Sequence, residues 1–231
     1  MKDPPNYFYD DNPLAAFRIR AAGVVWMCAV QFFVTQIVVQ SVWTSPFSLA
    51  TNFISDLGNT TCGNYPDVGG TYVCSPWHAL MNVSFSLQGV IILVGAILAR
   101  SVFRRERSRS LVFVLFILTG LGMIAVGLFP EDVNNNGHVI GAGVQFVTGN
   151  TALAVIGMTG RRVNLKRGWF VASTVLGLTG LAATLLFVSG YGLGLGIGGM
   201  ERVAAYTFPI WLIAAGILFI TKVSREAKPS D

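Results

Sequence analysis

The chain contains the stretch Leu111–Phe129, which reads LVFVLFILTGLGMIAVGLF and decides the fold. It has no Asp, Glu, Lys or Arg, and its apolar residues form a continuous run. An α-helix needs about 20 such residues to cross the hydrocarbon core of a bilayer. A strand of a membrane barrel would instead alternate apolar and polar residues. The stretch therefore predicts a transmembrane helix.

Five further windows have the same character and also lack charged residues. They are Ala21–Val42, Ala79–Ala99, Val139–Met158, Trp169–Val188 and Val203–Thr221. Only 12% of the chain is charged and its mean hydropathy is +0.61, whereas a soluble domain carries about 25% charged residues. We therefore expect an all-α, polytopic membrane bundle of six transmembrane helices, forming a single domain over residues 1–231. Its first partner is the lipid bilayer.

The basic residues predict the orientation of this bundle. Fifteen of the sixteen lie in the two tails and in the connections between helices two and three and between helices four and five, and only Arg202 falls on the other side. Because Lys and Arg are retained in the cytoplasm, both termini should be cytoplasmic, with tails at 1–20 and 222–231. The same residues account for the pI of 9.4, so we expect no nucleic-acid partner. We expect a multi-pass protein of the plasma membrane.

The cysteines divide between the first helix and the long outer loop, residues 43–78. Cys62 and Cys74 lie in that loop, and Cys28 lies in an apolar window. An oxidising outer compartment favours disulfides, so we predict a bond between Cys62 and Cys74. Cys28 is interpreted as a small apolar filler. The start of the loop, NFISDLG, is compatible with a short interfacial helix, and the rest reads as ordered turns.

Polar residues of the outer face suggest a pocket there. The outer side carries the acids Asp56, Asp67, Glu131, Asp132 and Glu201, the cation Arg202, and both histidines, His78 and His138. At helical spacing, His138, Gly141, Ala142, Gln145 and Gly149 share one face of helix four, and His78, Asn82 and Gly89 share one face of helix two. Lipid cannot satisfy such polar side chains, so these faces should point into the bundle. The alternative is that Asn82 and Gln145 only join helices by hydrogen bonds.

Metal chemistry receives little support from the spacing. Asp132, Asn134, Asn136 and Gly137 fit the first half of a calcium-binding loop, but Gly143 stands where its bidentate acid belongs. An Asx-rich turn that caps helix four is the simpler interpretation. His78, His138 and an aspartate would suit zinc, but the sequence has no paired-histidine spacing. We therefore assign no metal and no cofactor.

Several segments together resemble a known family. They are Asn52–Gly58, Cys74–Pro76, Asn82–Phe85, GLFPED with His138 and Gly141–Ala142, Gly149–Leu153, and GMERVAAY at Gly199–Tyr206. Jointly they resemble a large prokaryotic family of six-helix membrane proteins classed as a domain of unknown function, distantly similar to Frag, DRAM and Sfk-type membrane proteins. The resemblance implies one six-helix domain over nearly the whole chain. It marks Asp56, Asp132, His138, Asn150, Glu201 and Arg202, and it implies no activity.

Three hypotheses for the function follow. The first is a non-enzymatic protein whose outward-facing pocket binds a lipid headgroup or a small polar molecule. The residues expected to bind this ligand are Asp56, His78, Asn82, Asp132, His138, Gln145, Asn150, Glu201 and Arg202. Glu201 and Arg202 would form an ion-pair network with Asp56 or Asp132, or Arg202 would bind a phosphate. The second is a metal-dependent hydrolase or transferase acting on outer-leaflet lipid through His78, His138 and Asp132. The third is a transporter.

Overall fold

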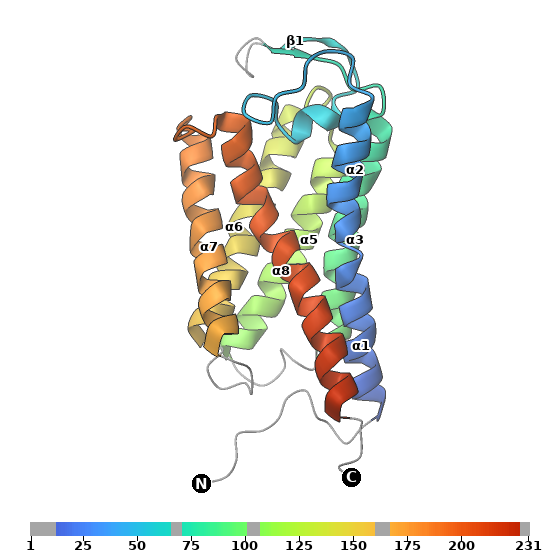
Figure 1. The fold of residues 1–231 in the computed structure, drawn as a ribbon, viewed down its shortest axis with the longest axis vertical. Helices are drawn as coiled ribbons and strands as arrows, with labels where there is room; N and C mark the ends of the chain where they lie inside the picture. The colour runs from blue at the N-terminus through green and yellow to red at the C-terminus, as the bar shows by residue number, and fades with distance from the viewer. Residues whose placement is uncertain (1–12, 66–70, 101–106, 160–166, 227–231) are drawn as a thin grey trace.

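A computed structural model of the chain describes residues 13–65, 71–100, 107–159 and 167–226. Asp67, most of the predicted N-terminal tail and the central parts of the two basic connections lie outside the described residues. Figure 1 shows a bundle of long helices with a loop region, which includes β1, at one end. We call this region (described residues 43–65 and 71–77) the cap.

Six helical segments are long and apolar enough to cross a membrane, as predicted. The first comprises α1 (Pro13–Met27) and α2 (Val30–Ser41), and the others are α3 (His78–Leu98), α5 (Arg107–Leu128), α6 (Asn135–Thr159), α7 (Arg167–Val188) and α8 (Ile197–Glu226). The predicted apolar windows differ from the observed helices most at the starts of two helices. The first span begins at Pro13 rather than Ala21, and α8 begins at Ile197 rather than Val203. Both helices extend past the charge-free windows, and each extension contains a buried residue, Ile19 in α1 and Met200 in α8. Packing therefore stabilises these added turns.

The helices pack in chain order and the ring closes on itself. The first span contacts α3, α3 contacts α5, α5 contacts α6, α6 contacts α7, α7 contacts α8, and α8 returns to α1. The start of α1 and the end of α8 lie at the same end of the bundle, opposite the cap (Figure 1). This arrangement agrees with an even number of crossings.

Small residues allow the helix backbones to approach closely. A Cβ atom on Gly23 of α1 would lie 2.8 Å from the carbonyl oxygen of Gly216 of α8, and one on Gly122 of α5 would lie 2.7 Å from that of Gly141 of α6. Real side chains cannot occupy those positions without moving the backbone. Packing through small residues is the usual means of helix association in lipid.

The first span is interrupted at Cys28 and Ala29. Around this turn the bonds shorten to a three-residue spacing, with the Ala29 amide donating to Trp26 O and the Gln31 amide donating to Cys28 O, both at 3.0 Å. No proline or glycine marks the position, so the sequence predicted one continuous helix. Fully buried Trp26 packs here against Phe116 and Phe219, with ring centroids 5.5 and 5.3 Å away. Aromatic packing therefore accompanies the break.

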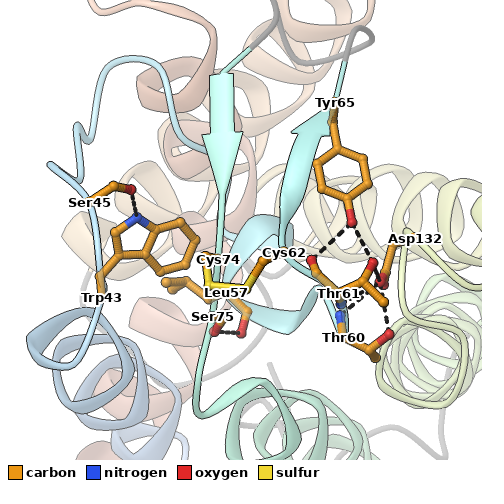
Figure 2. The surroundings of a disulfide bond; sticks show 10 residues. All are labelled: Trp43, Ser45, Leu57, Thr60, Thr61, Cys62, Tyr65, Cys74, Ser75 and Asp132. Atoms are coloured by element: carbon orange, nitrogen blue, oxygen red, sulfur yellow. Dashed lines mark hydrogen bonds between the residues drawn. A yellow bond between two sulfur atoms is a disulfide. The ribbon is translucent and has the colours of Figure 1, made fainter.

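The cap contains a short 3-10 helix and a hairpin. Helix η1 (Ser55–Gly58) falls within the predicted interfacial segment, and strands β1 (Gly63–Tyr65) and β2 (Thr71–Val73) pair antiparallel with Gly63 opposite Val73. The sequence predicted turns here and no strands. The predicted disulfide joins Cys62 to Cys74 at the base of the hairpin (Figure 2). It closes the loop from which the hairpin is built.

We predict that this disulfide shields both cysteines from thiol reagents. In a Cys28→Ala background, a membrane-impermeant maleimide should label the purified protein only after reduction. Reduction should also lower the melting temperature, because closing a loop of this length contributes about 3 kcal/mol to the free energy of unfolding. Labelling of either Cys62 or Cys74 without reductant would contradict the bond.

Candidate functional site

Arg202 attaches the first part of the cap to α8. Its Nη1 donates to the backbone carbonyls of Leu49 at 3.1 Å, Asn52 at 2.7 Å and Gly198 at 2.8 Å. The guanidinium carbon also lies 5.7 Å from the centroid of the Phe47 ring. The side chain is only 7% exposed. Leu49 and Asn52 belong to irregular backbone, so Arg202 satisfies two acceptors that no helix or sheet would pair.

Glu201, the neighbour of Arg202, holds the next part of the cap. Its Oε2 accepts a hydrogen bond from the backbone N–H of Ile54, the residue before η1. In place of the predicted ion pairs with Asp56 or Asp132, the three hydrogen bonds that Arg202 donates through Nη1 go to backbone carbonyl oxygens. A carboxylate and a guanidinium therefore act side by side as anchors for cap backbone.

Asp56 stabilises η1 from within. Its Oδ2 accepts from the Phe53 amide at 2.9 Å and from Asn52 Nδ2 at 3.2 Å, and the side chain is fully buried. Burial raises the pKa of Asp56 to about 6, although these two hydrogen bonds act in the opposite direction. The carboxyl group thus belongs to the internal structure of the cap.

Asp132, in the connection between α5 and α6, binds Thr60 and Thr61, which follow η1. Its Oδ2 accepts from the amides of Thr60 and Thr61, both at 2.9 Å, and from their hydroxyls at 2.8 and 3.0 Å (Figure 2). Partial burial acts to raise the pKa of Asp132, but these bonds outweigh it and leave the pKa below its ordinary value. This is an anchor for the cap rather than half of a calcium loop.

Two asparagines from the predicted set also serve structural contacts. Asn82 Nδ2 on α3 donates to Gly58 O at 2.8 Å. Asn150 Nδ2 on α6 donates to the Phe146 and Ala204 carbonyls, and its Oδ1 accepts from Thr207. The first joins the cap to α3 and the second joins α6 to α8. The sequence analysis kept such a joining role as the alternative for Asn82 and Gln145, whereas it counted Asn150 only among the ligand-binding residues.

A cavity lies below η1, between the cap-proximal halves of the spans. Its free volume is about 30 Å³, enough for two or three water molecules. The apolar wall includes four phenylalanines, Phe32, Phe85, Phe146 and Phe208. The polar lining residues are Ser55, Gln88, His138, Gln145 and Glu201. The cavity therefore combines aromatic walls with a few convergent polar groups, as small-molecule sites commonly do.

Three of the five residues in the predicted stripe on α6 face this cavity. His138, Ala142 and Gln145 all line it, as the helical spacing indicated. His138 Nδ1 lies 2.9 Å from the Phe129 carbonyl oxygen. Because a carbonyl only accepts, Nδ1 carries the proton, and Nε2 is an acceptor whenever the ring is uncharged. The α6 stripe thus contributes an imidazole and an amide.

Three of the nine predicted ligand-binding residues line the cavity, and six do not. His138, Gln145 and Glu201 lie around it, whereas the remaining six are Asp56, His78, Asn82, Asp132, Asn150 and Arg202. The two histidines do not converge there, because half-buried His78 begins α3 at the base of the cap while His138 lies inside the bundle. Among the described residues, no three His, Cys, Asp or Glu side chains are grouped to hold a metal ion.

Gln88 is a lining residue that the sequence analysis missed. It is 2% exposed, and its Oε1 accepts from Gln31 Nε2 at 3.2 Å. Gln31 in turn binds Ser84 through both ends of its amide, donating to the carbonyl at 3.2 Å and accepting from the hydroxyl at 2.7 Å. A glutamine within an apolar run was the available signal, because lipid cannot satisfy its amide.

We predict that Arg202→Gln lowers the melting temperature in detergent by the equivalent of about 3 kcal/mol, because it releases cap carbonyls and leaves a buried carboxylate beside no cation. Exposed Arg18, at the other end of the bundle, provides the matched control, and Arg18→Gln should cost below about 1 kcal/mol. Adding Glu201→Gln to Arg202→Gln should restore part of the loss. Equal stability of the two single variants would contradict the anchoring role.

The comparisons place the chain in a family and give it no closer relative. Comparison with curated proteins and with solved structures found no match. The family model described as "Protein of unknown function (DUF998)" matches residues 27–218. That range contains the four middle spans in full, parts of the first and last spans, the cap, and every lining residue of the cavity. The chain therefore belongs to the DUF998 family of membrane proteins, as its motifs indicated.

Proposed function

We propose that this protein is a binding protein of the plasma membrane whose cavity receives a small polar molecule or the polar end of a lipid headgroup. One observation carries the proposal. Gln88, His138, Gln145 and Glu201 come from three separate helices and line the same aromatic-walled space. Four polar side chains inside an apolar bundle are costly unless they have partners. A ligand in the cavity would supply them.

The cap fits the role of a cover for this cavity. Ser55 of η1 and the preceding Ile54 are part of the lining, and Glu201 both lines the cavity and binds the Ile54 amide. Hydrogen bonds attach the cap to α3, to α8 and to the connection before α6. The cap therefore holds a fixed position over the cavity. Its disulfide and the distribution of basic residues favour an extracytoplasmic position.

The alternatives receive less support. A metal-dependent hydrolase requires a ligand cluster, which the described residues do not form. Two features would suit a transporter. One is the break between α1 and α2, and the other is Pro209 in α8, which lines the cavity and cannot donate to the Ala205 carbonyl. The favoured reading is binding, because the observations concern a lined cavity rather than a path across the membrane.

The proposed orientation predicts the behaviour of reporter fusions. A reporter that functions only in the cytoplasm should be active when fused after Asp231. A reporter that functions only after export should be active when inserted between residues 66 and 70, within the cap hairpin. The reciprocal fusions are the controls and should be inactive. Cytoplasmic activity of the cap insertion would reverse the orientation and remove the case for an outward-facing site.

Filling the cavity tests binding itself. Ala142 lines the cavity on α6, so Ala142→Leu should occupy the space at a packing cost of about 1–3 kcal/mol. Ala182 is exposed on α7, and Ala182→Leu is the matched control. Native mass spectrometry of protein purified from its own membrane should show a bound molecule on wild type and on Ala182→Leu, and not on Ala142→Leu. No bound molecule on wild type, or equal occupancy on all three proteins, would contradict the proposal.

A further inference from the structure

The hydrogen-bond chain behind Gln88 fixes which of its amide atoms is free. The Ser84 carbonyl can only accept, so the Gln31 atom 3.2 Å from it must be the nitrogen. That same nitrogen lies 3.2 Å from Gln88, so the Gln88 atom there must be the oxygen. Nε2 of Gln88 is therefore left as a donor. Among the described residues, it is the only buried side-chain polar atom of the cavity lining that has no hydrogen-bond partner.

The other side of the cavity offers acceptors. His138 lines the cavity with Nδ1 bonded to the Phe129 carbonyl, so Nε2 of the uncharged ring is an acceptor. Glu201 uses Oε2 for the Ile54 amide, which leaves Oε1 for another donor. A ligand that satisfies this lining must accept a hydrogen bond from Gln88 and donate to His138 or Glu201. The lining combines a hydrogen-bond donor with acceptors, so it discriminates between classes of ligand.

A hydroxyl group meets both demands, and charged groups do not. An ammonium has no lone pair and would leave Gln88 Nε2 unpaired. An ionised carboxylate or a phosphate diester has no proton to donate to the other side of the cavity, and the guanidinium of Arg202 is not part of the lining. A hydroxyl both donates and accepts, and it pairs with Glu201 in either protonation state. The four phenylalanines give apolar contact for the carbon atoms that carry such hydroxyls.

We propose that the cavity binds a neutral hydroxylated group, a polyol, through Gln88 as donor and His138 and Glu201 as acceptors. This inference rests on the proposed binding function and names its ligand class. The polyol is either the terminal glycerol or sugar of a lipid headgroup or the same molecule free in solution. The free volume of about 30 Å³ suits the hydroxyl-bearing end of such a molecule.

The test compares a neutral diol with a cation of similar size. Binding of propane-1,3-diol and of propylammonium to the purified protein is followed by saturation-transfer NMR, with Ala142→Leu as the blocked reference. Wild type should bind the diol at least about tenfold more tightly than propylammonium, and Ala142→Leu should abolish the signal. Tighter binding of propylammonium that is also abolished by Ala142→Leu would overturn the polyol assignment and leave the binding function standing. Binding of neither compound that depends on the cavity would overturn both.

Variants of Gln88 provide the matched chemical change. Gln88→Met keeps the shape and removes the donor, so it should weaken diol binding about tenfold, while Gln40→Met on α2, away from the cavity, should not. Gln88→Glu keeps the acceptor for Gln31 and replaces the free donor by an acceptor, so it should reverse the preference toward propylammonium. An unchanged preference in folded Gln88→Glu would overturn the role of Gln88. If neither variant folds, the wild-type ranking still decides the ligand class.

The source of the polyol is distinguished in nanodiscs. Phosphatidylglycerol ends in a neutral diol and phosphatidylethanolamine ends in an ammonium. Displacement of the bound diol by phosphatidylglycerol alone would identify a lipid headgroup, and displacement by neither lipid would identify a free polyol. Displacement by phosphatidylethanolamine at equal mole fraction would contradict the assignment.

Discussion

The attachment of the cap through Arg202 is the interaction on which the rest of the structure depends. A guanidinium that is 7% exposed is costly to bury, and it is retained here because one of its nitrogens is surrounded by three carbonyl oxygens. The carbonyls of Leu49 and Asn52 need the cation equally, because residues 49–52 form neither helix nor strand. The charge and the irregular backbone therefore stabilise each other. Glu201 extends the contact by one residue to the Ile54 amide.

The cavity is a consequence of this attachment. Once segment 49–58 is held against α8 and α3, its 3-10 helix covers the space between the spans and contributes Ser55 to the lining. Gln88, His138 and Gln145 are then enclosed in an apolar bundle together with Glu201. Gln88, His138 and Glu201 are held by bonds to Gln31, to the Phe129 carbonyl and to the cap, so much of the site is formed before any ligand enters. Preformed polar groups of this kind favour specificity.

Much of the fold could be predicted from the sequence because hydropathy and disulfide chemistry act locally. Six charge-free windows give six candidate spans in the described part of the chain, and the two cysteines of the cap form a bond. The break at Cys28–Ala29 could not be predicted, because no proline or glycine marks it. The β-hairpin was missed because its strands are only three residues long and their pairing is set by the disulfide and the cap contacts.

The candidate site was predicted less well, for a physical reason. Sequence indicates that a polar residue must have a partner in the bundle, but it does not indicate whether that partner is backbone or ligand. Asp132, Asn82 and Arg202 have backbone partners, and they therefore anchor the cap. Gln88 has a partner for its oxygen and none for its nitrogen. That difference depends on the Gln31–Ser84 contact between two helices, which the sequence does not contain.

The central claim is that a hydroxylated molecule occupies a cavity built under an anchored cap. It is tested most directly by an experimental density map of the protein purified in its native lipids, at a resolution that shows side chains. The account predicts compact density within hydrogen-bond distance of both Gln88 Nε2 and the Glu201 carboxylate, enclosed by the four phenylalanines. An empty cavity, or one filled by a lipid acyl chain, would contradict it.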